Sequence, residues 1–451
     1  MKIKEKKVII IVMDKFYHII TYGCQMNVHE SEKIAGILSE MGYESCNDIE
    51  KADIVVFNTC CIRENAENHA YGNIGMFKKL KAKKRDMIIA VGGCLPQQMN
   101  KAGNLHEKFP YVDIIFGTHN LNRLKELILE KQSRKKAVIE IEETDGKICE
   151  EDRPLRTSYP NAWVNITYGC NNFCSYCIVP YVRGRERSRK SENIIREVKS
   201  LIDSGYKEIT LLGQNVNSYG NGNEEIPFYK LLERVANIDG KFRVRFMTSH
   251  PKDFSEELAK VIAANPKICH CVHLPVQSGS DAILAAMNRK YSSQDYLKKV
   301  ELLKKYVPDC AITTDIIVGF PGETDEDFKA TLNLVKTVDY ASAFTFVYSK
   351  REGTVAAKLP NQISEDVCKR RIMELVELVN AQTRAHSLKF VNKVVEVLCE
   401  DYDAKRGFYL GRSEHGRMVY FKSENNLIGN FVQIKINEAN GVSLFGDIVN
   451  G

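Results

Sequence analysis

Apolar runs alternate with helix-like segments along the first third of the chain. The predicted strands are Phe16–Thr21, Asp53–Asn58, Met87–Val91 and Val112–Phe116. The predicted helices are Ser31–Met41, Asn65–Lys81 and Leu121–Lys131. This order indicates an α/β domain built on a doubly wound parallel sheet with helices on both faces. The charged segment Gln132–Arg156 lacks long apolar periodicity, so we expect a linker that carries at most a hairpin.

The middle of the chain repeats the strand–helix pattern at greater length. The predicted strands are Ala162–Thr167, Glu208–Leu212, Arg243–Met247, Cys271–Leu274, Ala311–Val318 and Ser342–Phe346. Helical patterns between them include Asn193–Ser204, Tyr229–Ala236, Ser255–Ala264 and Gln294–Tyr306. Because parallel strands need crossover helices, this pattern predicts a partial (β/α) barrel. A long helix, roughly Glu365–Lys389, closes the section.

From about Phe390 the chain changes to short β-like runs separated by Gly, Asn and Asp. The runs are Val394–Leu398, Arg417–Phe421, Phe431–Ile436 and Ser443–Asp447. They predict a small β-barrel of about sixty residues. The expected parts are therefore an N-terminal extension (1–14), a sheet domain (15–132), a linker (133–155), a barrel core (156–386) and a small β-barrel domain (389–451).

Composition narrows the class of protein. At 451 residues, with 44% hydrophobic and 27% charged residues, the chain has the composition of a soluble multidomain protein. Its net charge of +6 is compatible with a nucleic-acid partner without requiring one. The apolar run Val8–Met13 is too short for a signal peptide or a membrane span, and no small-residue cleavage site follows it. We therefore expect a cytoplasmic protein with no membrane association, whose fourteen cysteines stay reduced and available for metals.

Three cysteines stand close together just after a predicted strand: Cys170, Cys174 and Cys177. One loop with this spacing can wrap a [4Fe–4S] cluster, and three thiolates leave one iron open to a small molecule. A zinc knuckle or buried free cysteines are the alternatives. Zinc normally takes a fourth Cys or His nearby, and none follows before His250. An iron–sulfur cluster is the favoured interpretation.

Three more cysteines each follow a predicted strand of the first domain: Cys24, Cys60 and Cys94. Neighbouring carboxyl ends of a parallel sheet converge on one crevice, so these thiols can meet although they are far apart in sequence. Each could be an ordinary buried cysteine, but three at equivalent places favour a second three-ligand cluster. Apart from Cys61, which follows Cys60 directly, the remaining seven are interpreted as structural: Cys46, Cys149, Cys269, Cys271, Cys310, Cys368 and Cys399.

Two of those seven, Cys269 and Cys271, flank His270 in an arrangement typical of metal ligands. Alternation along a strand puts both cysteines on one face, which makes core packing at least as good an explanation.

The spacing of Cys170, Cys174 and Cys177, followed by Ile178-Val-Pro, resembles the radical S-adenosylmethionine (SAM) enzymes. In that family the amino and carboxylate groups of SAM chelate the open iron, and reductive cleavage of SAM yields a 5′-deoxyadenosyl radical. The resemblance implies further cofactor contacts at the carboxyl ends of the barrel strands. The candidates are Gln214, Asn215, His273, Gln277, Asp315, Gly319 and Glu323. For these, a satisfied histidine and simple glycine turns are the plain alternatives.

Nearly the whole chain from about Lys15 resembles the methylthiotransferases, and specifically the MiaB type that modifies tRNA. The matching segments are Thr-Tyr-Gly-Cys-Gln-Met-Asn at 21–27, Asn-Thr-Cys-Cys-Ile-Arg-Glu-Asn-Ala-Glu at 58–67, and the stretches 168–170 and 181–189. The resemblance implies a cluster-binding N-terminal domain, a radical SAM core and a TRAM-like RNA-binding domain. Cys61 departs from the family, which usually has a small residue there, typically alanine. We assign the ligand role to Cys60 and leave replacement by its neighbour Cys61 as an open alternative.

The resemblance also implies a mechanism with two [4Fe–4S] clusters. Cleavage of SAM at the Cys170, Cys174 and Cys177 cluster would start hydrogen abstraction from C2 of an adenine. The cluster on Cys24, Cys60 and Cys94 would deliver sulfur, and a second SAM would methylate it. The expected substrate is N6-isopentenyladenosine in the tRNA anticodon loop. We expect a monomer that depends on an external electron donor and an external sulfur or cluster source.

Two basic stretches offer contacts to an anionic substrate, and the first also offers contacts to the SAM carboxylate; the family resemblance, and not this pattern, implies that the substrate is RNA. Five basic residues follow the cluster loop: Arg183, Arg185, Arg187, Arg189 and Lys190. The tail mixes cations with aromatics, namely Lys405, Arg406, Arg412, Arg417, Lys422, Phe408, Tyr409, Tyr420 and Phe421. Such a mixture suits phosphate attraction and base stacking. A solvated loop is the alternative for the first set, and about half of the aromatics are expected to fill the small barrel.

Three rival functions remain. Two are related methylthiotransferases, acting on threonylcarbamoyl-adenosine in tRNA or on an aspartate of a ribosomal protein. The residues after Cys24 and Cys60 argue against both. The third is a non-catalytic iron–sulfur or zinc protein that only binds RNA. Two separate three-cysteine sets, each without a fourth ligand, argue against it.

Overall fold

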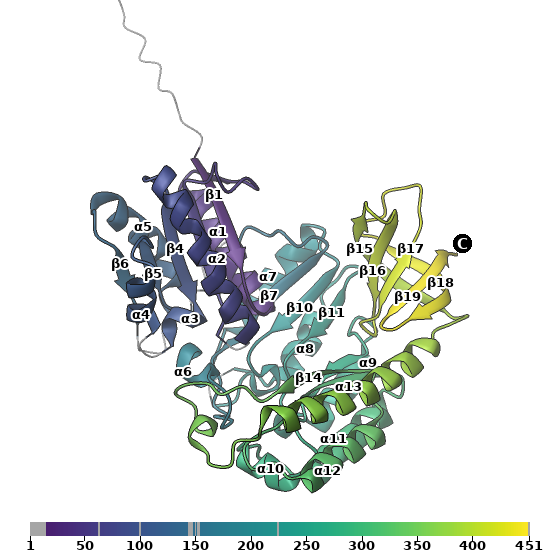
Figure 1. The fold of residues 1–451 in the computed structure, drawn as a ribbon. Coiled ribbons are helices and arrows are strands. Elements are labelled where there is room, and N and C mark those ends of the chain that lie inside the picture. Colours follow the sequence, from purple (N-terminus) through teal and green to yellow (C-terminus); the bar gives the residue numbers. More distant parts are fainter. Residues whose placement is uncertain are drawn as a thin grey trace, which may run out of the picture. The chain divides into compact units, whose positions relative to one another are not determined.

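The computed structural model describes residues 15–61, 64–98, 101–142, 148, 150, 154–222 and 225–449. The chain divides into two compact units, Met1–Leu155 and Arg156–Gly451 (Figure 1). The expected extension 1–14 and Cys149 lie outside the described residues. In the ranges that the structure describes, no helix is both long and apolar enough to cross a lipid bilayer.

The first unit contains a six-stranded parallel sheet in the order β2-β1-β3-β4-β5-β6. Its strands are β1 (Lys15–Thr21), β2 (Tyr43–Ser45), β3 (Ile54–Thr59), β4 (Ile88–Gly93), β5 (Ile114–Phe116) and β6 (Val138–Glu140). Its helices are α1 (Gln25–Glu40), α2 (Glu64–Lys83), α3 (Cys94–Gln97), α4 (Lys101–Lys108), η1 (Leu121–Arg123) and α5 (Leu124–Ser133).

Helices cover both faces of this sheet, because its central strands are apolar on both sides. Every residue of β3 and β4 is buried. Along β3, Val56 packs into a cluster with residues of α1 and α5, while its neighbour Phe57 packs with residues of α2 and α4. The predicted doubly wound sheet is confirmed.

Two predictions for this unit were wrong. The segment expected as a linker with a hairpin contributes β6, which pairs in parallel with β5. The first helix begins at Gln25, whereas the sequence pattern placed its start at Ser31. The pattern misses the first turns because polar side chains there, such as Asn27 and Glu30, are buried in place of apolar ones. Cys24 consequently lies at the N-terminal cap of α1.

The core of the second unit has two three-stranded parallel sheets, β11-β10-β7 and β12-β13-β14. An isolated parallel bridge, Val244 to Ile268, links β11 to the segment that enters β12, so the six strands form one arc. Its main strands are β7 (Asn161–Asn165), β10 (Glu208–Leu212), β11 (Arg243–Phe246), β12 (Cys271–His273), β13 (Ala311–Val318) and β14 (Ser342–Val347). A short antiparallel pair adds β8 (Thr167–Tyr168) and β9 (Arg187–Ser188). The predicted partial barrel is confirmed.

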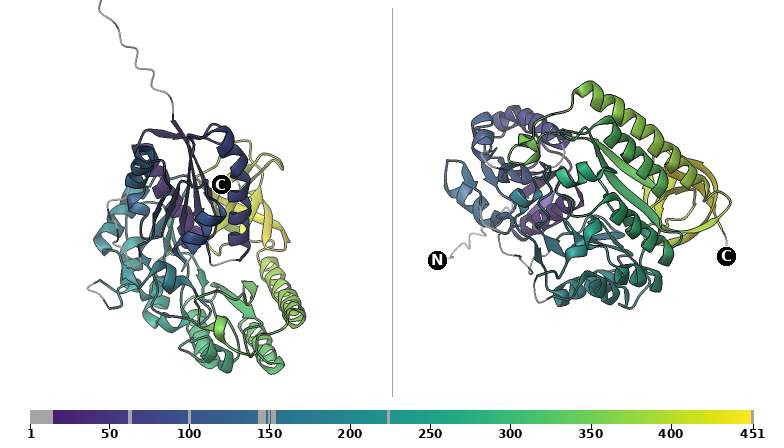
Figure 2. Two further views of the ribbon diagram at one scale, coloured as in Figure 1. Left: turned by 60° about the vertical axis from the view of Figure 1, so that its left-hand side comes forward. Right: turned by 90° about the horizontal axis from the view of Figure 1, so that it is seen from below.

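Helices surround this arc, and the longest of them leads directly into the C-terminal strands (Figure 2). They are α6 (Val179–Arg183), α7 (Ser191–Asp203), η2 (Val216–Ser218), α8 (Phe228–Ala236), η3 (Pro251–Asp253), α9 (Glu256–Ala264), α10 (Asp281–Ala286), α11 (Ser293–Tyr306), α12 (Asp325–Val338), η4 (Ala356–Lys358) and α13 (Glu365–Leu388).

The C-terminal strands close into a small barrel in the order β15-β16-β17-β19-β18. They are β15 (Val394–Asp403), β16 (Phe408–Ser413), β17 (Met418–Phe421), β18 (Phe431–Asn440) and β19 (Ser443–Ile448). The sequence pattern misses β16, because Gly411 interrupts its apolar residues. A Cβ at Gly411 would lie 2.1 Å from the carbonyl oxygen of Leu398, so close approach of β15 requires glycine there.

Candidate functional site

Cys170, Cys174 and Cys177 lie on one loop between β8 and α6. The loop starts at Gly169, where φ is +76° and a Cβ would lie 2.1 Å from the carbonyl oxygen of Arg185. The Cys177 amide donates to the carbonyl oxygen of Cys174 at 2.9 Å, which turns the loop back on itself. The side-chain amide of Asn288 donates from Nδ2 to the carbonyl oxygen of Phe173 at 2.9 Å. The loop is thus held from both sides.

A buried arginine lies beside these thiols. Arg289 donates from Nη1 towards Cys174 Sγ at 3.5 Å, and from Nη2 to the carbonyl oxygen of Pro275 at 2.8 Å. Its Nε donates to the Tyr291 hydroxyl at 2.8 Å. A fixed cation here favours negative charge on sulfur. Sequence reasoning missed Arg289, because no local motif connects it with the cysteine loop.

Without a metal, Cys170 and Cys177 hold their protons at neutral pH. Burial raises the pKa of Cys170 to about 11 and that of Cys177 to about 12. Metal ligation requires thiolates, so cluster binding has to release these protons. Two thiols on one loop that ionise only when they bind metal suit a cluster site.

Buried polar atoms gather at the carboxyl ends of the core strands. In the described part of the chain, side-chain atoms of Asn165, Asn217, Ser249, His250 and Tyr348 are buried without a hydrogen-bond partner. They follow or end β7, β10, β11 and β14. Buried polar groups in proteins are nearly always satisfied. A polar ligand such as SAM therefore fits at this end of the barrel.

His250 shows what such a ligand would meet. Burial, with the charges of Arg289 and Lys252, lowers the pKa of His250 to about 2, so the ring is neutral. The backbone amide of Lys252 donates to His250 Nδ1 at 3.2 Å. The ring proton therefore lies on Nε2, which becomes a buried donor for an acceptor outside the protein.

Three of the sequence-predicted cofactor residues lie together beside β13. His273 Nε2 lies 3.4 Å from Asp315 Oδ2, and His273 Nδ1 lies 2.9 Å from Thr313 Oγ1. Gln277 has φ of +74°, and its backbone N–H donates to the carbonyl oxygen of Asp315 at 2.9 Å. The partial barrel brings these residues to one edge.

The other predicted cofactor residues contact the protein itself. Asn215, which follows Gln214 after β10, donates to Asp253 Oδ2 at 2.7 Å and accepts from the His250 amide at 3.1 Å. Glu323 accepts from the Gly319 amide and from Arg371 Nη1, both at 2.8 Å. These contacts hold the turns at the strand ends. The cofactor roles of all seven residues stay predictions.

The second cysteine set lies at one edge of the sheet in the first unit. Cys24 follows β1, Cys60 follows β3 and Cys94 begins α3 after β4. The three strands are neighbours, with Thr21 opposite Asn58 and Asn58 opposite Gly92. A Cβ at Gly23 would lie 2.9 Å from Cys60 Sγ, so this sulfur packs directly against the turn that carries Cys24.

A fourth thiol reaches the same place. Cys61 is buried and forms a hydrogen bond with Cys94. That bond and burial raise the pKa of Cys61 well above its usual value. Among the described residues, neither cysteine triad brings three ligand atoms within 4.8 Å, the spacing expected around one ion. Wider spacing suits thiolates that bind different irons of a cluster.

Comparison with known proteins identifies the parts. Residues 164–335 match the radical SAM superfamily, residues 16–117 match an uncharacterized protein family, UPF0004, and residues 388–449 match the TRAM domain. The tRNA-2-methylthio-N(6)-dimethylallyladenosine synthase of Caldicellulosiruptor saccharolyticus is 51% identical over 97% of this chain and 93% of that protein. The one from Clostridium botulinum strain Langeland is 51% identical over 96% of both. The chain belongs to this synthase family.

Family membership and the radical SAM match make the chain a radical SAM enzyme that uses SAM and [4Fe–4S] clusters. Solved structures support the fold. The radical SAM methyltransferase TsrM from Kitasatospora setae superposes with a TM-score of 0.57 at 15% identity, covering 76% of this chain and 77% of that one. The cobalamin-dependent radical SAM enzyme OxsB gives 0.51 at 12% identity, covering 82% and 56%.

The basic residues after the cluster loop have different environments. Arg189 is buried and donates to Glu197 Oε2 at 2.7 Å and to the carbonyl oxygen of Asn165 at 2.8 Å. Arg183 is also buried, whereas Arg185 and Lys190 are exposed. The Arg185 guanidinium lies 4.4 Å from the ring centre of Phe173. Two members of this basic run are therefore exposed to a substrate, and two are buried.

The TRAM domain separates core from surface aromatics, as expected. Tyr409 and Phe421 lie in its core. Phe408 and Tyr420 are only half-buried, and Tyr420 stacks on Phe445 with ring centres 5.2 Å apart. Of the tail cations predicted to contact RNA, Lys405, Arg406 and Lys422 are exposed. Arg417 is buried and donates to the carbonyl oxygen of Ala341 at 2.8 Å, which joins the barrel to the core.

Proposed function

We propose that the chain adds a methylthio group to C2 of N6-isopentenyladenosine in the anticodon loop of tRNA. Family membership is the main support for this proposal: relatives that are 51% identical over almost the whole chain are synthases of the 2-methylthio nucleoside. The reaction inserts sulfur into an unactivated C–H bond, and this chain has one cysteine set for radical chemistry and another for sulfur.

Cys170, Cys174 and Cys177 hold one [4Fe–4S] cluster and leave one iron for SAM. Cys24, Cys60 and Cys94 hold the other. When bound, these groups supply the 5′-deoxyadenosyl radical, the inserted sulfur and the methyl group. The buried Arg289 stabilises negative charge on the first cluster through its contact with Cys174 Sγ at 3.5 Å.

The strand ends bind and orient SAM. Asn217, Ser249 and His250 offer buried polar atoms without protein partners, and the neutral His250 donates from Nε2. His273 and Asp315, 3.4 Å apart, add a polar pair at the same end of the barrel. Surrounding apolar strands exclude water, which would otherwise compete with the reaction.

The TRAM domain binds the tRNA. Lys422 lies 5.3 Å from the ring centre of Phe408, and Tyr420 stacks on Phe445, so cations and aromatic faces lie side by side. Cations of this kind attract phosphates, and half-exposed rings stack on unpaired bases. An anticodon-loop base can be turned out of its stack and reach the radical site. We place this activity in the cytoplasm and in a monomer, with the electron donor and the sulfur source supplied by other proteins.

Mass spectrometry of tRNA nucleosides tests the proposal. Cells without this chain should lose the 2-methylthio nucleoside and accumulate N6-isopentenyladenosine, and the wild-type chain should restore it. The Cys174→Ala chain, expressed to the same level, should fail to do so. Loss of the methylthio group from threonylcarbamoyl-adenosine would favour the first rival. An unchanged nucleoside profile together with an unmodified ribosomal aspartate would favour the second.

A further inference from the structure

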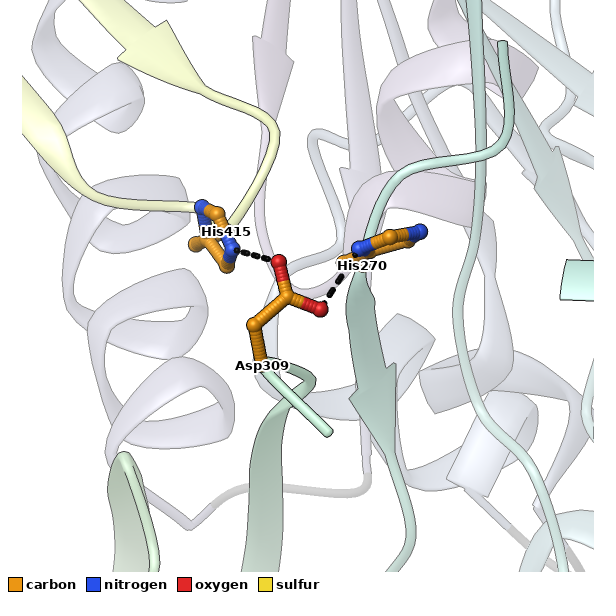
Figure 3. A group of neighbouring side chains, drawn as sticks. All are labelled: His270, Asp309 and His415. Carbon is orange, nitrogen blue, oxygen red and sulfur yellow. Dashed lines mark hydrogen bonds and ion pairs between the residues drawn. The ribbon is translucent and has the colours of Figure 1, made fainter. Parts of the chain in front are cut away.

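Three side chains from separate segments meet where the core contacts the small barrel: His270, Asp309 and His415 (Figure 3). His270 immediately precedes β12, Asp309 lies in the turn after α11, and His415 lies in the turn between β16 and β17. The Asp309 carboxylate lies between the two rings. Its Oδ1 is 2.8 Å from His270 Nδ1, and its Oδ2 is 3.2 Å from His415 Nε2.

These distances suit a metal ion. The three ligand atoms lie within 4.8 Å of one another, and no other set of three among the described residues does so. A tetrahedral ion with metal–ligand distances of about 2.1 Å separates its ligands by about 3.4 Å. Small side-chain rotations would therefore bring the two nitrogens and one oxygen onto a single ion.

The backbone around the cluster is held in place. Buried Arg245 donates from Nη1 to the carbonyl oxygen of Glu414 at 3.2 Å and from Nη2 to that of Ser413 at 3.1 Å. The amide of Ala311 donates to the carbonyl oxygen of His270 at 2.9 Å. Ligands on fixed backbone segments bind metals with little loss of entropy.

The ligand types select the metal. Two imidazoles and one carboxylate suit zinc and other divalent transition ions better than calcium or magnesium, which prefer oxygen ligands. Zinc binds such sets more tightly than iron(II). Asp309 is 57% exposed, and it lines a pocket of about 620 Å³ together with His415, so water can complete the coordination. The flanking cysteines, Cys269 and Cys271, do not belong to the set.

We propose that His270, Asp309 and His415 form a zinc site that fastens the turn at 413–417 to the core. The site uses none of the six cluster cysteines and does not depend on the proposed function. Without zinc the same residues form a hydrogen-bonded bridge, so the proposal and this simpler arrangement predict different metal contents.

Zinc K-edge absorption of the full chain tests the site, because it detects zinc regardless of iron. The chain is first reconstituted with iron and sulfide, so that the cluster cysteines are occupied, and is then dialysed against zinc. The expected result is one zinc per chain with only nitrogen and oxygen neighbours and the outer-shell scattering of imidazole. His415→Gln and Asp309→Asn should weaken zinc binding at least about tenfold.

His386→Gln is the matched control, because His386 lines the same pocket but pairs with Asp339 at 3.0 Å. It should bind zinc like the wild type. Zinc should also raise the melting temperature and slow amide exchange at 413–417 in the wild type, but not in His415→Gln. Melting without zinc shows whether each variant folds. Absence of bound zinc in the wild type, or sulfur neighbours at about 2.3 Å, would overturn the proposal.

Discussion

The two cysteine sites differ in how the chain assembles them. Cys170, Cys174 and Cys177 lie on one loop, and local contacts such as the bond from the Cys177 amide to the Cys174 carbonyl hold them together. Cys24, Cys60 and Cys94 come from three neighbouring strands, and the register of a parallel sheet aligns them. The first site depends on one turn of chain, and the second depends on the correct pairing of strands throughout its unit.

The largest expected effect separates the two sites by their chemistry. Cys174→Ala should reduce release of 5′-deoxyadenosine from SAM and reductant to background, while Cys60→Ala should leave that release intact. After anaerobic reconstitution, Cys174→Ala should fall from about eight irons per chain to about four, and Cys60→Ala should fall equally far unless Cys61 replaces its neighbour as ligand. Iron analysis and chromatography of the nucleoside check this. If Cys174→Ala still cleaves SAM, the assignment of the radical site fails.

The stability of the second unit, which contains the cysteine loop, should fall at acidic pH because of one buried carboxylate, Glu208. Burial alone would raise the pKa of Glu208, but the charges of Arg245 and Arg243 outweigh it and hold the pKa well below its usual value of 4.5. A lowered carboxyl pKa stabilises the fold above the unfolded value, and this contribution is lost as pH falls below about 4.5.

Glu208→Gln should therefore destabilise the second unit by about 3–5 kcal/mol near neutral pH, because two arginines lose their buried partner. It should also flatten the fall in stability below pH 4.5. Urea unfolding at several pH values measures both effects. An equally steep fall in the variant would mean that other groups cause the acid sensitivity.

Substitution of two glycines tests whether the two cysteine sites bind iron independently of each other. Gly23 lies beside the cysteines that come from separate strands, and Gly169 starts the loop that carries the other three. Gly23 has φ of +110° and its Cβ would lie 2.5 Å from Cys60 Cβ, so Gly23→Ala should disturb only the scattered site. Gly169→Ala should disturb only the loop site. Each costs about 1–3 kcal/mol of local strain and should lower iron content by up to half. Gly103→Ala is the control, because no atom lies within 4 Å of its Cβ position. If Gly23→Ala empties both sites, the two sites are not independent.

The smallest expected effect concerns the fourth thiol. Cys61→Ala should keep about eight irons per chain, because Cys60 and not Cys61 is the proposed ligand. The double variant Cys60→Ala, Cys61→Ala should bind fewer irons than Cys60→Ala alone if Cys61 replaces its neighbour. Iron content and the electron paramagnetic resonance of the reduced clusters check both. Loss of iron in Cys61→Ala would make Cys61 the ligand.

Strong local patterns predicted most of the fold. The strands β10 and β13 were predicted to the residue, because long apolar runs bounded by turns leave little choice. The pattern failed where pairing partners decide the structure. Short β6 becomes a strand only because β5 offers it an edge, and β16 contains a glycine whose role depends on a neighbouring carbonyl.

The candidate site residues also divide into those that a local sequence pattern predicts and those that only tertiary contacts reveal. The cysteine loop was identified from its spacing alone, whereas Arg289 and His250 have no motif and reach the site only through the barrel. Six of the seven predicted cofactor residues are polar in sequence, but only the structure shows that His273 pairs with Asp315, whereas Asn215 bonds to Asp253 and Glu323 bonds to Arg371.

The sequence by itself determined most of the element types, the loop that carries Cys170, Cys174 and Cys177, and the position of three cysteines after three strands. Periodicity and close spacing are local properties that the chain carries in any state. Tertiary structure alone decided that Cys61 contacts Cys94, that Arg245 holds the turn of His415, and that His270 and Asp309 lie beside that histidine. Such contacts join residues far apart in the chain, and only packing brings them together.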